Sequence, residues 1–382
     1  MYNVVFFILL LFSFVEIFSK TNLKKHAKLI FFFLLLMIVL RYGQGSDYFN
    51  YIYLINWLAD RMEEKNYLLA FTQEPGFSLL SYLWIKPLKL SAELLIAFIS
   101  GLSFFLMWLF IKKYSLKPIT SLLIFYTTFY LVYPYSGIRQ AICISIFVLY
   151  LVPLLQTKKY IKYFIFSILL ILFHTSSVIL IIIPIVNLLK RYTILQIYFV
   201  SIISLGLGIL FYSVLFSMLG SVGFIGEKID DYRTSSSFDF MALLLRILIF
   251  IPIMLTFKVY QRGSLKDTFL KIYILGFLLY LMFFSNSLIS SRLNVYMRYF
   301  EAILIVDYLV YELNNKREAL LHYFYIISIL SVLYVKNINS FILQGDYDKN
   351  ITFWNYPYIS VFDKSKATIL RTVPDHYMSY IK

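Results

Sequence analysis

Apolar runs of helical length recur along this chain and are separated by short loops rich in Lys and Arg. Hydrophobic residues make up 61% of the sequence and charged residues only 14%, whereas soluble domains carry about 25% charged residues. So little charge cannot cover the surface of a water-soluble globule of 382 residues. The runs therefore predict an all-α fold, a polytopic transmembrane helix bundle with no soluble domain.

The apolar runs predict about twelve spans in a single integral-membrane domain, residues 1–382. The predicted spans are residues 2–18, 26–41, 92–111, 119–135, 139–156, 160–174, 175–189, 194–219, 241–257, 268–286, 295–313 and 319–335. The first lacks a basic start and a small-residue cleavage site, so we expect a retained span rather than a signal peptide. The short runs 160–174 and 175–189 predict a tight hairpin that turns at His174.

Lys and Arg gather in alternate loops, so the net charge of +15 is concentrated on one predicted side of the membrane. The basic loops contain Lys20, Lys24, Lys25 and Lys28; Lys112, Lys113 and Lys117; Lys158, Lys159 and Lys162; Lys190 and Arg191; Lys258, Arg262, Lys266 and Lys271; and Lys316 and Arg317. Positively charged loops stay in the cytoplasm. The outer side then holds residues 42–91, the turns at Gly137 and His174, 220–240, 287–298 and the tail 336–382, with both termini outside. The charge is a topology signal and indicates no nucleic-acid partner.

Two segments of the predicted first outer loop, residues 42–91, are not expected to span the membrane. If residues 77–90 crossed, every later basic loop would face outward, so we expect a re-entrant or interfacial segment there. Such a segment is tolerated only where protein or a wet cavity surrounds it. Residues 48–70 alternate aromatic and charged side chains and predict an amphipathic helix at the membrane surface.

Ionisable residues gather on the predicted outer side, and such residues near membrane depth favour a functional site. In RYGQGSDYFNY, Arg41 either binds a phosphate with its planar guanidinium or reaches lipid headgroups. Asp47 either serves the site or caps the next helix. In YSGIRQAI, Gly137 interrupts a helix, and Arg139 with Gln140 begins the next. A cation is disfavoured at a helix N-terminus, so Arg139 indicates either an anion bound beside it or a headgroup contact.

His174 lies in LILFHTSSVIL, at the predicted outer hairpin turn. It is either a hydrogen-bonded structural residue or a base that removes a proton from a hydroxyl near neutral pH. Glu74, in EPGF, precedes the predicted re-entrant segment and is either a second acid of the site or a helix-start residue.

The stretch SSRLNVYMRYFEAIL carries two further arginines. Arg292 and Tyr296 are four residues apart and would share a helix face, whereas Arg298 would not share it. We favour Arg292 for substrate and Arg298 for a buried ion pair with Glu301, while keeping Tyr296 and Arg298 among the candidate substrate-binding residues.

Several catalytic motifs are absent from the sequence: a Walker phosphate loop, an HExxH metal pair and a nucleophile elbow. No cytoplasmic segment is long enough to form an ATP-binding domain. We therefore expect no cofactor and no metal, and a substrate that already carries its own activation and is reached from the outer face.

In order along the chain, RYGQGSDY, EPGF, SGIRQAI, FHTSS, SSRLNVY and YPYISVFD resemble the EpsG-like branch of the Wzy-type polysaccharide polymerases, from Arg41 to Asp363. The resemblance implies polymerisation of O-antigen of lipopolysaccharide, capsule or exopolysaccharide in a bacterial inner membrane. The substrates would be undecaprenyl-pyrophosphate-linked oligosaccharide repeats in the outer leaflet, and a chain-length regulator and a flippase would be partners. The family's functional residues would map onto Arg41, Asp47, Arg139, His174 and Arg292, with Arg298 as an extra basic residue.

The implied chemistry is a metal-independent glycosyl transfer with lipid pyrophosphate as the leaving group. Arginines would stabilise the charge that develops on it, and His174 is the preferred base, with Asp47 or Glu74 in reserve. One alternative is an O-antigen ligase or another polyprenyl-linked glycosyltransferase, but ligases usually carry one large late outer loop, whereas 220–240 and 287–298 are short. A flippase or transporter is the non-enzymatic alternative, although the sequence lacks the internal repeat typical of one.

Overall fold

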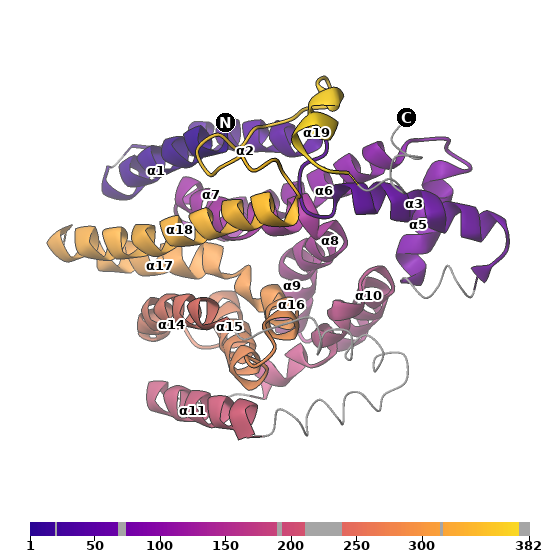
Figure 1. The fold of residues 1–382 in the computed structure, drawn as a ribbon. Helices are drawn as coiled ribbons and strands as arrows, with labels where there is room; N and C mark the ends of the chain where they lie inside the picture. The colour runs from indigo at the N-terminus through magenta and orange to yellow at the C-terminus, as the bar shows by residue number, and fades with distance from the viewer. Residues whose placement is uncertain (20, 68–73, 189–192, 211–238, 314–315, 374–382) are drawn as a thin grey trace.

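Helices make up the architecture in the computed structural model, which describes residues 1–19, 21–67, 74–188, 193–210, 239–313 and 316–373 (Figure 1). Within these residues there is no β-sheet, and extended pairing is limited to two isolated antiparallel bridges, Arg41–Ser360 and Tyr347–Arg371. The all-α prediction is confirmed. The predicted loop 220–240, the end of the predicted span 194–219 and the basic residues Lys20, Lys190 and Arg191 lie largely or wholly outside the described residues.

The following helices correspond to the predicted spans, and most of them begin and end within a few residues of the prediction, whereas the last two differ more. They are α1 (Tyr2–Phe18), α2 (Lys24–Val39), α6 (Ala92–Tyr114), α7 with η1 (Pro118–Phe125, Tyr126–Ser136), α8 with η2 and α9 (Ile138–Ile146, Phe147–Leu151, Val152–Gln156), α10 (Tyr160–Phe173), η3 and η4 (Thr175–Ile181, Ile183–Asn187), α11 (Ile194–Leu210), α14 with η5 (Phe240–Leu255, Thr256–Lys258), α15 (Leu265–Met282), α17 (Glu301–Glu312) and α18 (Lys316–Gln344). In Figure 1 the long helices are stacked roughly side by side, from α1 and α2 to α11.

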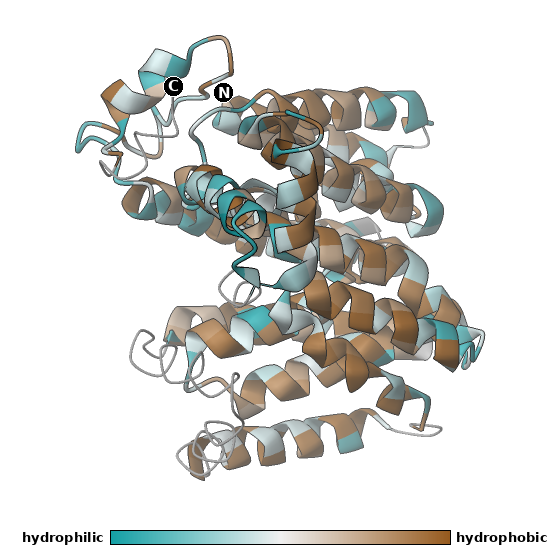
Figure 2. Cartoon of the chain, turned by 90° about the vertical axis from the view of Figure 1, so that its right-hand side faces the viewer, coloured by the Kyte–Doolittle hydropathy of each residue, from teal (hydrophilic) through white to brown (hydrophobic). Residues whose placement is uncertain are grey.

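Three helices of the described part are long and apolar enough to cross a membrane: Ala92–Tyr114, Ile138–Gln156 and Arg317–Gln344. Shorter apolar helices accompany them at Tyr2–Phe18, Tyr160–Phe173, Thr175–Asn187, Ile194–Leu210 and Phe240–Leu255. In Figure 2 apolar residues cover the helices, and polar residues lie mainly at the helix ends and in the connections. The chain is therefore a helical membrane protein, while the number of about twelve spans and their orientation remain predictions.

The predicted hairpin at His174 is present, but its second arm is a 3₁₀-helix. The hydroxyl of Tyr163 in α10 donates a hydrogen bond to the carbonyl oxygen of Leu180 in η3 at 2.7 Å, so the two arms lie antiparallel. A 3₁₀-helix rises about 2.0 Å per residue, against 1.5 Å for an α-helix. The short run Thr175–Asn187 therefore extends to about 26 Å, close to the hydrocarbon thickness of about 30 Å.

The first outer loop forms two helices that pack on the bundle. Helix α3 (Tyr48–Glu63) is amphipathic as predicted, and its apolar face is buried against α5 (Pro75–Ile85) and α6. Its place at the membrane surface stays a prediction. Helix α5 has 11 residues, about half the length that a perpendicular span needs. Its shortness is consistent with the predicted non-spanning segment at 77–90.

Near the C-terminus the helix bounds differ from the predicted ones. Residues 287–298, predicted as an outer loop, form helix α16 (Ser287–Arg298), and the predicted span 295–313 is broken between α16 and α17. Polar residues hid α16 from a hydropathy reading, yet the Asn286 side chain caps it by accepting from the Ile289 N–H at 3.0 Å. Helix α18 continues to Gln344, so the tail begins later than residue 336.

The tail runs back over the first outer loop. The Tyr42 N–H donates to the Ile359 carbonyl at 2.9 Å, and the Val361 N–H donates to the Leu40 carbonyl at 2.8 Å. Two of the motifs found in the sequence, RYGQGSDY and YPYISVFD, thus pair with each other. In Figure 1 the tail helix α19 (Lys364–Leu370) lies beside the end of α2.

Candidate active site

Sequence-distant motifs meet at the start of α8. The start of the first outer loop, the start of α5, the turn between α10 and η3, and helix α16 all reach this point. The structure brings together Asp47, Glu74, Arg139, Gln140, His174, Arg292 and Tyr296, whereas Arg41 and Arg298 have their own partners elsewhere.

Glu74 is the centre of this cluster, and its side chain is only 6% exposed. One carboxylate oxygen accepts a hydrogen bond from Arg139 Nη1, which forms a buried ion pair. The other accepts from the Thr175 hydroxyl at 3.1 Å and lies 3.5 Å from His174 Nδ1. A single carboxylate therefore contacts both the candidate anion-binding cation and the candidate base.

The EPGF motif explains why Glu74 reaches this place. Glu74 has φ +70°, a strained conformation for a residue with a side chain, and such strain concentrates at functional sites. Pro75 follows at the first position of α5, where its missing N–H costs nothing. A Cβ on Gly76 would lie 3.0 Å from the Leu172 carbonyl oxygen and 3.1 Å from the Phe173 ring. Glycine therefore lets α5 approach the end of α10, directly before His174.

A Gly76→Ala variant is expected to lower activity by roughly 10- to 100-fold, because it pushes Glu74 away from His174 and misplaces the site. The contact with a backbone carbonyl cannot relax as a flexible side chain would, so overpacking outweighs the gain in helix propensity. The measurement is formation, at matched protein levels, of the polymer that the family resemblance implies. Gly206→Ala is the control, since nothing lies within 4 Å of a Cβ built there; equal activity of both variants would contradict the proposed close approach.

Arg139 lies in the first turn of α8 with its side chain 17% exposed. Its guanidinium lies over the rings of Tyr51 and Phe77, at 5.5 and 5.2 Å from their centroids, and Nε is 3.5 Å from the Tyr51 hydroxyl. Tyr51 was missed as a site residue, although it lies four residues after Asp47, and residues at that spacing share a helix face. Aromatic faces thus hold Arg139 in place beside Glu74.

Gln140 and Tyr296 join elements of the site to one another. The Gln140 amide donates to the Arg292 carbonyl oxygen at 2.8 Å and to the Ser176 hydroxyl at 3.0 Å. The Tyr296 hydroxyl lies 2.8 Å from the Ser177 hydroxyl, and its side chain is fully buried. Both residues were predicted to bind substrate, and the structure gives them partners that fix the His174 turn against α8 and α16.

Asp47 faces the arginines of the site. Its side chain is half-buried, and burial raises the pKa of its carboxyl, while the Ser46 hydroxyl and the charges of Arg292, Arg139 and Arg371 act in the opposite direction. Asp47 begins α3 without a side-chain capping bond, so the alternative role as a helix cap is not observed.

The environment of His174 favours the neutral imidazole. Burial lowers the pKa of the ring, and the charges of Arg139 and Arg292 lower it further, whereas Glu74 raises it. Nδ1 is buried without a hydrogen-bond partner among the described residues, since its distance to Glu74 is long. A neutral ring at pH 7 is the form that accepts a proton.

Arg41 supports the loop that carries Asp47. It is 2% exposed and donates to the carbonyl oxygens of Ile38 at 2.6 Å and Tyr135 at 3.0 Å, and to the Ser100 hydroxyl at 3.1 Å. Its guanidinium also stacks 4.5 Å from the centre of the Tyr135 ring. Protein carbonyls and the Ser100 hydroxyl thus accept from its two terminal nitrogens, whereas Nε has no hydrogen-bond partner among the described residues.

Arg371, from the tail, was not predicted. Its guanidinium donates to the carbonyl oxygens of Gly43 and Gly45 at 2.9 Å each, and of Ser46 at 3.1 Å. Gly45 has φ +105°, and a Cβ there would lie 2.8 Å from the Tyr135 carbonyl, so only glycine fits. The tail therefore holds the loop that presents Asp47.

Arg298 forms the ion pair with Glu301 that the spacing indicated. Nε and Nη2 contact the two carboxylate oxygens at 2.9 and 3.1 Å, and both side chains are buried. The pair lies at the break between α16 and α17, with the cation at a helix C-terminus and the acid at an N-terminus, as the helix dipoles favour. Among the described residues no group of three or more His, Cys, Asp and Glu could hold a metal ion.

The deciding observation on identity is that the model of the EpsG family matches residues 24–358. The chain belongs to the EpsG family. The match includes each of the site residues from Arg41 to Arg298 but not Arg371, and membership supports a polysaccharide polymerase-like role in the membrane. No curated protein and no solved structure matches the chain.

Proposed function

We propose that this EpsG-family protein polymerises undecaprenyl-pyrophosphate-linked oligosaccharide repeats at the outer face of a bacterial inner membrane. The observation that carries the proposal is the cluster of Glu74, Arg139 and His174, with Arg292 and Asp47 around it. It combines cationic donors with a neutral imidazole on the side that the charge bias predicts to be outside.

The reaction transfers a glycan from one lipid carrier to another. A hydroxyl oxygen of the acceptor sugar attacks the anomeric carbon of the donor, and a new glycosidic C–O bond forms. The bond between that carbon and the pyrophosphate oxygen breaks, and the lipid pyrophosphate leaves with the electron pair. The hydroxyl proton passes to a base, so atoms and charge balance without a further reactant.

Arg139 and Arg292 are the residues proposed to stabilise the leaving pyrophosphate. Guanidinium groups bind phosphate oxygens through paired N–H donors and stay charged at every physiological pH. Preorganised donors act most strongly where charge develops in the transition state and water is excluded. Glu74 and the rings of Tyr51 and Phe77 hold Arg139 in such a position before substrate arrives.

His174 is the proposed general base. Its ring is only 14% exposed, and its lowered pKa keeps it neutral at pH 7. When the imidazole takes the hydroxyl proton it becomes cationic, and the Glu74 carboxylate 3.5 Å from Nδ1 stabilises that charge. Asp47 remains the alternative base, since the same arginines surround it.

The test is to give the purified full-length protein in lipid nanodiscs only the lipid-linked repeat. A polymerase forms a ladder of products that differ by one repeat, with stoichiometric release of lipid pyrophosphate. A requirement for lipid A as acceptor would assign the protein as a ligase. Movement of labelled repeat across vesicles without elongation would assign it as a flippase, and either result would reject the proposal.

A further inference from the structure

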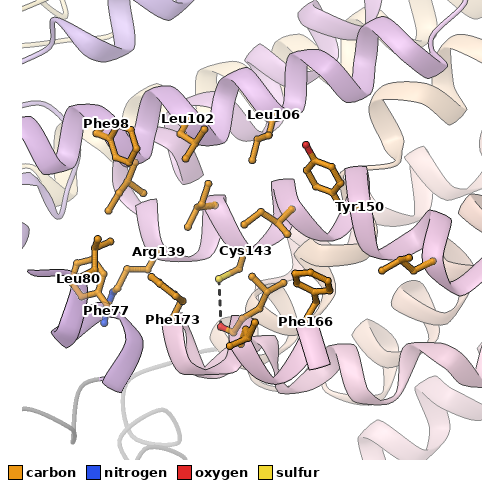
Figure 3. A pocket seen from close by; sticks show the side chains of 16 residues that line it. Phe77, Leu80, Phe98, Leu102, Leu106, Arg139, Cys143, Tyr150, Phe166 and Phe173 are labelled. Atoms are coloured by element: carbon orange, nitrogen blue, oxygen red, sulfur yellow. Dashed lines mark hydrogen bonds between the residues drawn. The ribbon is translucent and has the colours of Figure 1, made fainter. Parts of the chain in front are cut away.

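An apolar groove extends from Arg139 along the outside of the bundle (Figure 3). Its volume is about 760 Å³, within the range of ligand pockets. Helices α6, α8 and α10 form its walls, and α5 closes its outer end with Phe77 and Leu80. In Figure 3 Arg139 lies at that end, and Tyr150 and Phe166 lie toward the other. Arg139 is the one charged residue among the described residues that line it.

One wall of the groove is a stripe along the α8–η2–α9 span. It contains Arg139, Ile142, Cys143 and Ile146 of α8, Tyr150 of η2 and Leu154 of α9; Cys143 directly follows Ile142, and the other steps are three or four residues. From Arg139 to Leu154 this stripe is about 20 Å long at 1.5 Å per residue. The groove therefore runs through most of the hydrocarbon thickness of a bilayer, which is about 30 Å.

The groove opens toward the lipid. Phe98 on α6, Tyr150 on the α8–η2–α9 span and Leu169 on α10 line it and are between 46% and 54% exposed. Tyr150 and Leu154 also line an adjoining hollow that contains Lys112 and Lys113, at the predicted cytoplasmic end of α6. A chain that entered laterally would thus have a continuous apolar path from the site toward the inner leaflet.

We propose that this groove binds the isoprenoid chain of the donor lipid, with its pyrophosphate at Arg139. The inference rests on the proposed function and names the substrate to which the groove belongs. The charge pattern of the groove is complementary to a lipid pyrophosphate: the groove has one cation at the end beside the reacting groups, and the rest of its lining is apolar. The donor is the occupant because its pyrophosphate is the group that must leave beside Glu74 and His174.

A membrane phospholipid would fit this surface less well. Its two chains diverge within a few bonds of the phosphate, whereas an isoprenoid carrier is one chain that continues directly from its pyrophosphate. The groove runs between α6 and α10, and at the end that α5 closes the centre of the Phe77 ring lies 5.2 Å from the Arg139 guanidinium carbon. The shared chemistry of both lipids is an anionic headgroup on an apolar chain, so the experiment compares them directly.

The experiment uses full-length protein in nanodiscs and a sugar-free undecaprenyl pyrophosphate that carries a diazirine on its chain. Photolysis is expected to label peptides of α6, α8 and α10 that line the groove. Unlabelled undecaprenyl pyrophosphate should compete, whereas the same amount of phosphatidylglycerol should not. Leu169→Trp, which fills the groove, is expected to lower labelling by about 10-fold.

Ile168→Trp is the matched control on the same helix, since Ile168 is 55% exposed and does not line the groove. It should label as the unmodified protein does, and both variants should have the same melting temperature in detergent. Labelling that falls outside the groove, or equal competition by phosphatidylglycerol, would overturn the proposal. Because the probe carries no sugar, groove labelling without ladder formation would reject the polymerase function and leave the lipid site standing.

Discussion

A His174→Gln variant is expected to lose ladder formation by roughly 10²- to 10⁴-fold, the factor that a positioned general base contributes. The amide of glutamine is polar but cannot take up the hydroxyl proton near neutral pH. His174 lies half-buried in the turn after α10 and makes no hydrogen bond through Nδ1 to described residues, so its loss removes no strong structural contact there. The measurement is the initial rate of ladder formation in nanodiscs at equal protein content.

Two further variants make the result specific. His26→Gln changes an exposed histidine in the first turn of α2, at the predicted cytoplasmic end, and should leave the rate unchanged. Asp47→Asn tests the alternative base. If Asp47→Asn abolished the ladder and His174→Gln retained it, the proton would go to Asp47 and the assignment of His174 would be wrong.

The pH dependence follows from the lowered pKa of His174. The neutral, competent ring is present above its pKa and is lost as pH falls through that value. Because burial, Arg139 and Arg292 lower this pKa, the acid limb of the rate is expected below the ordinary histidine value of about 6.5. The ladder rate is measured between pH 5 and 8, with a point about every half pH unit, to locate the pH at which the rate falls. A fall above about pH 6.5 would contradict a lowered pKa of His174.

The bundle could be predicted from the sequence because lipid leaves the backbone few choices. Every backbone N–H and C=O inside a bilayer must be satisfied within the protein, so an apolar run of span length forms a helix. Helix α1, predicted at residues 2–18, has those bounds. Helix α16 does not stand out as an apolar run, because many of its side chains are polar: contacts with α15 and η3 stabilise it, and a hydropathy pattern does not report such contacts.

The candidate site could be predicted in part, because charge bias places loops on one side of a membrane. That argument brought Glu74, Arg139 and His174 to the same side, and the structure places them in contact. Charge bias could not predict whether a side chain on that side points outward or into the protein. Arg41 lies on the same side, yet its guanidinium turns inward to backbone carbonyls.

Arg371 had no signal in the sequence at all. Its hydrogen-bond acceptors are main-chain carbonyls of residues 43, 45 and 46, and every residue type has such a carbonyl. Only the fold of the tail onto the first outer loop reveals the contact. A sequence pattern therefore predicts an ion pair between two charged residues more readily than a contact between a side chain and the main chain of a loop.

Arg139→Gln and Glu74→Gln are each expected to destabilise the protein by about 3–5 kcal/mol, because each leaves a charged partner buried without its counterion. The double variant removes both charges and retains groups that can hydrogen-bond, so most of that stability should return. Its ladder rate should stay lower by about 10²- to 10³-fold, since the donor that stabilises the leaving pyrophosphate is gone. Melting temperature and ladder rate are measured on the same preparations.

The two single variants should also move the acid limb in opposite directions. Arg139 lowers the pKa of His174 and Glu74 raises it. Residual activity of Arg139→Gln should therefore fall at a higher pH than that of the unmodified protein, and residual activity of Glu74→Gln at a lower pH. If the double variant recovered activity together with stability, Arg139 would serve only the folding of α5 against α8, and its contact with pyrophosphate would have to be abandoned. Recovery of stability alone would mean that the charges of Arg139 and Glu74 act on the reaction itself and not only on folding.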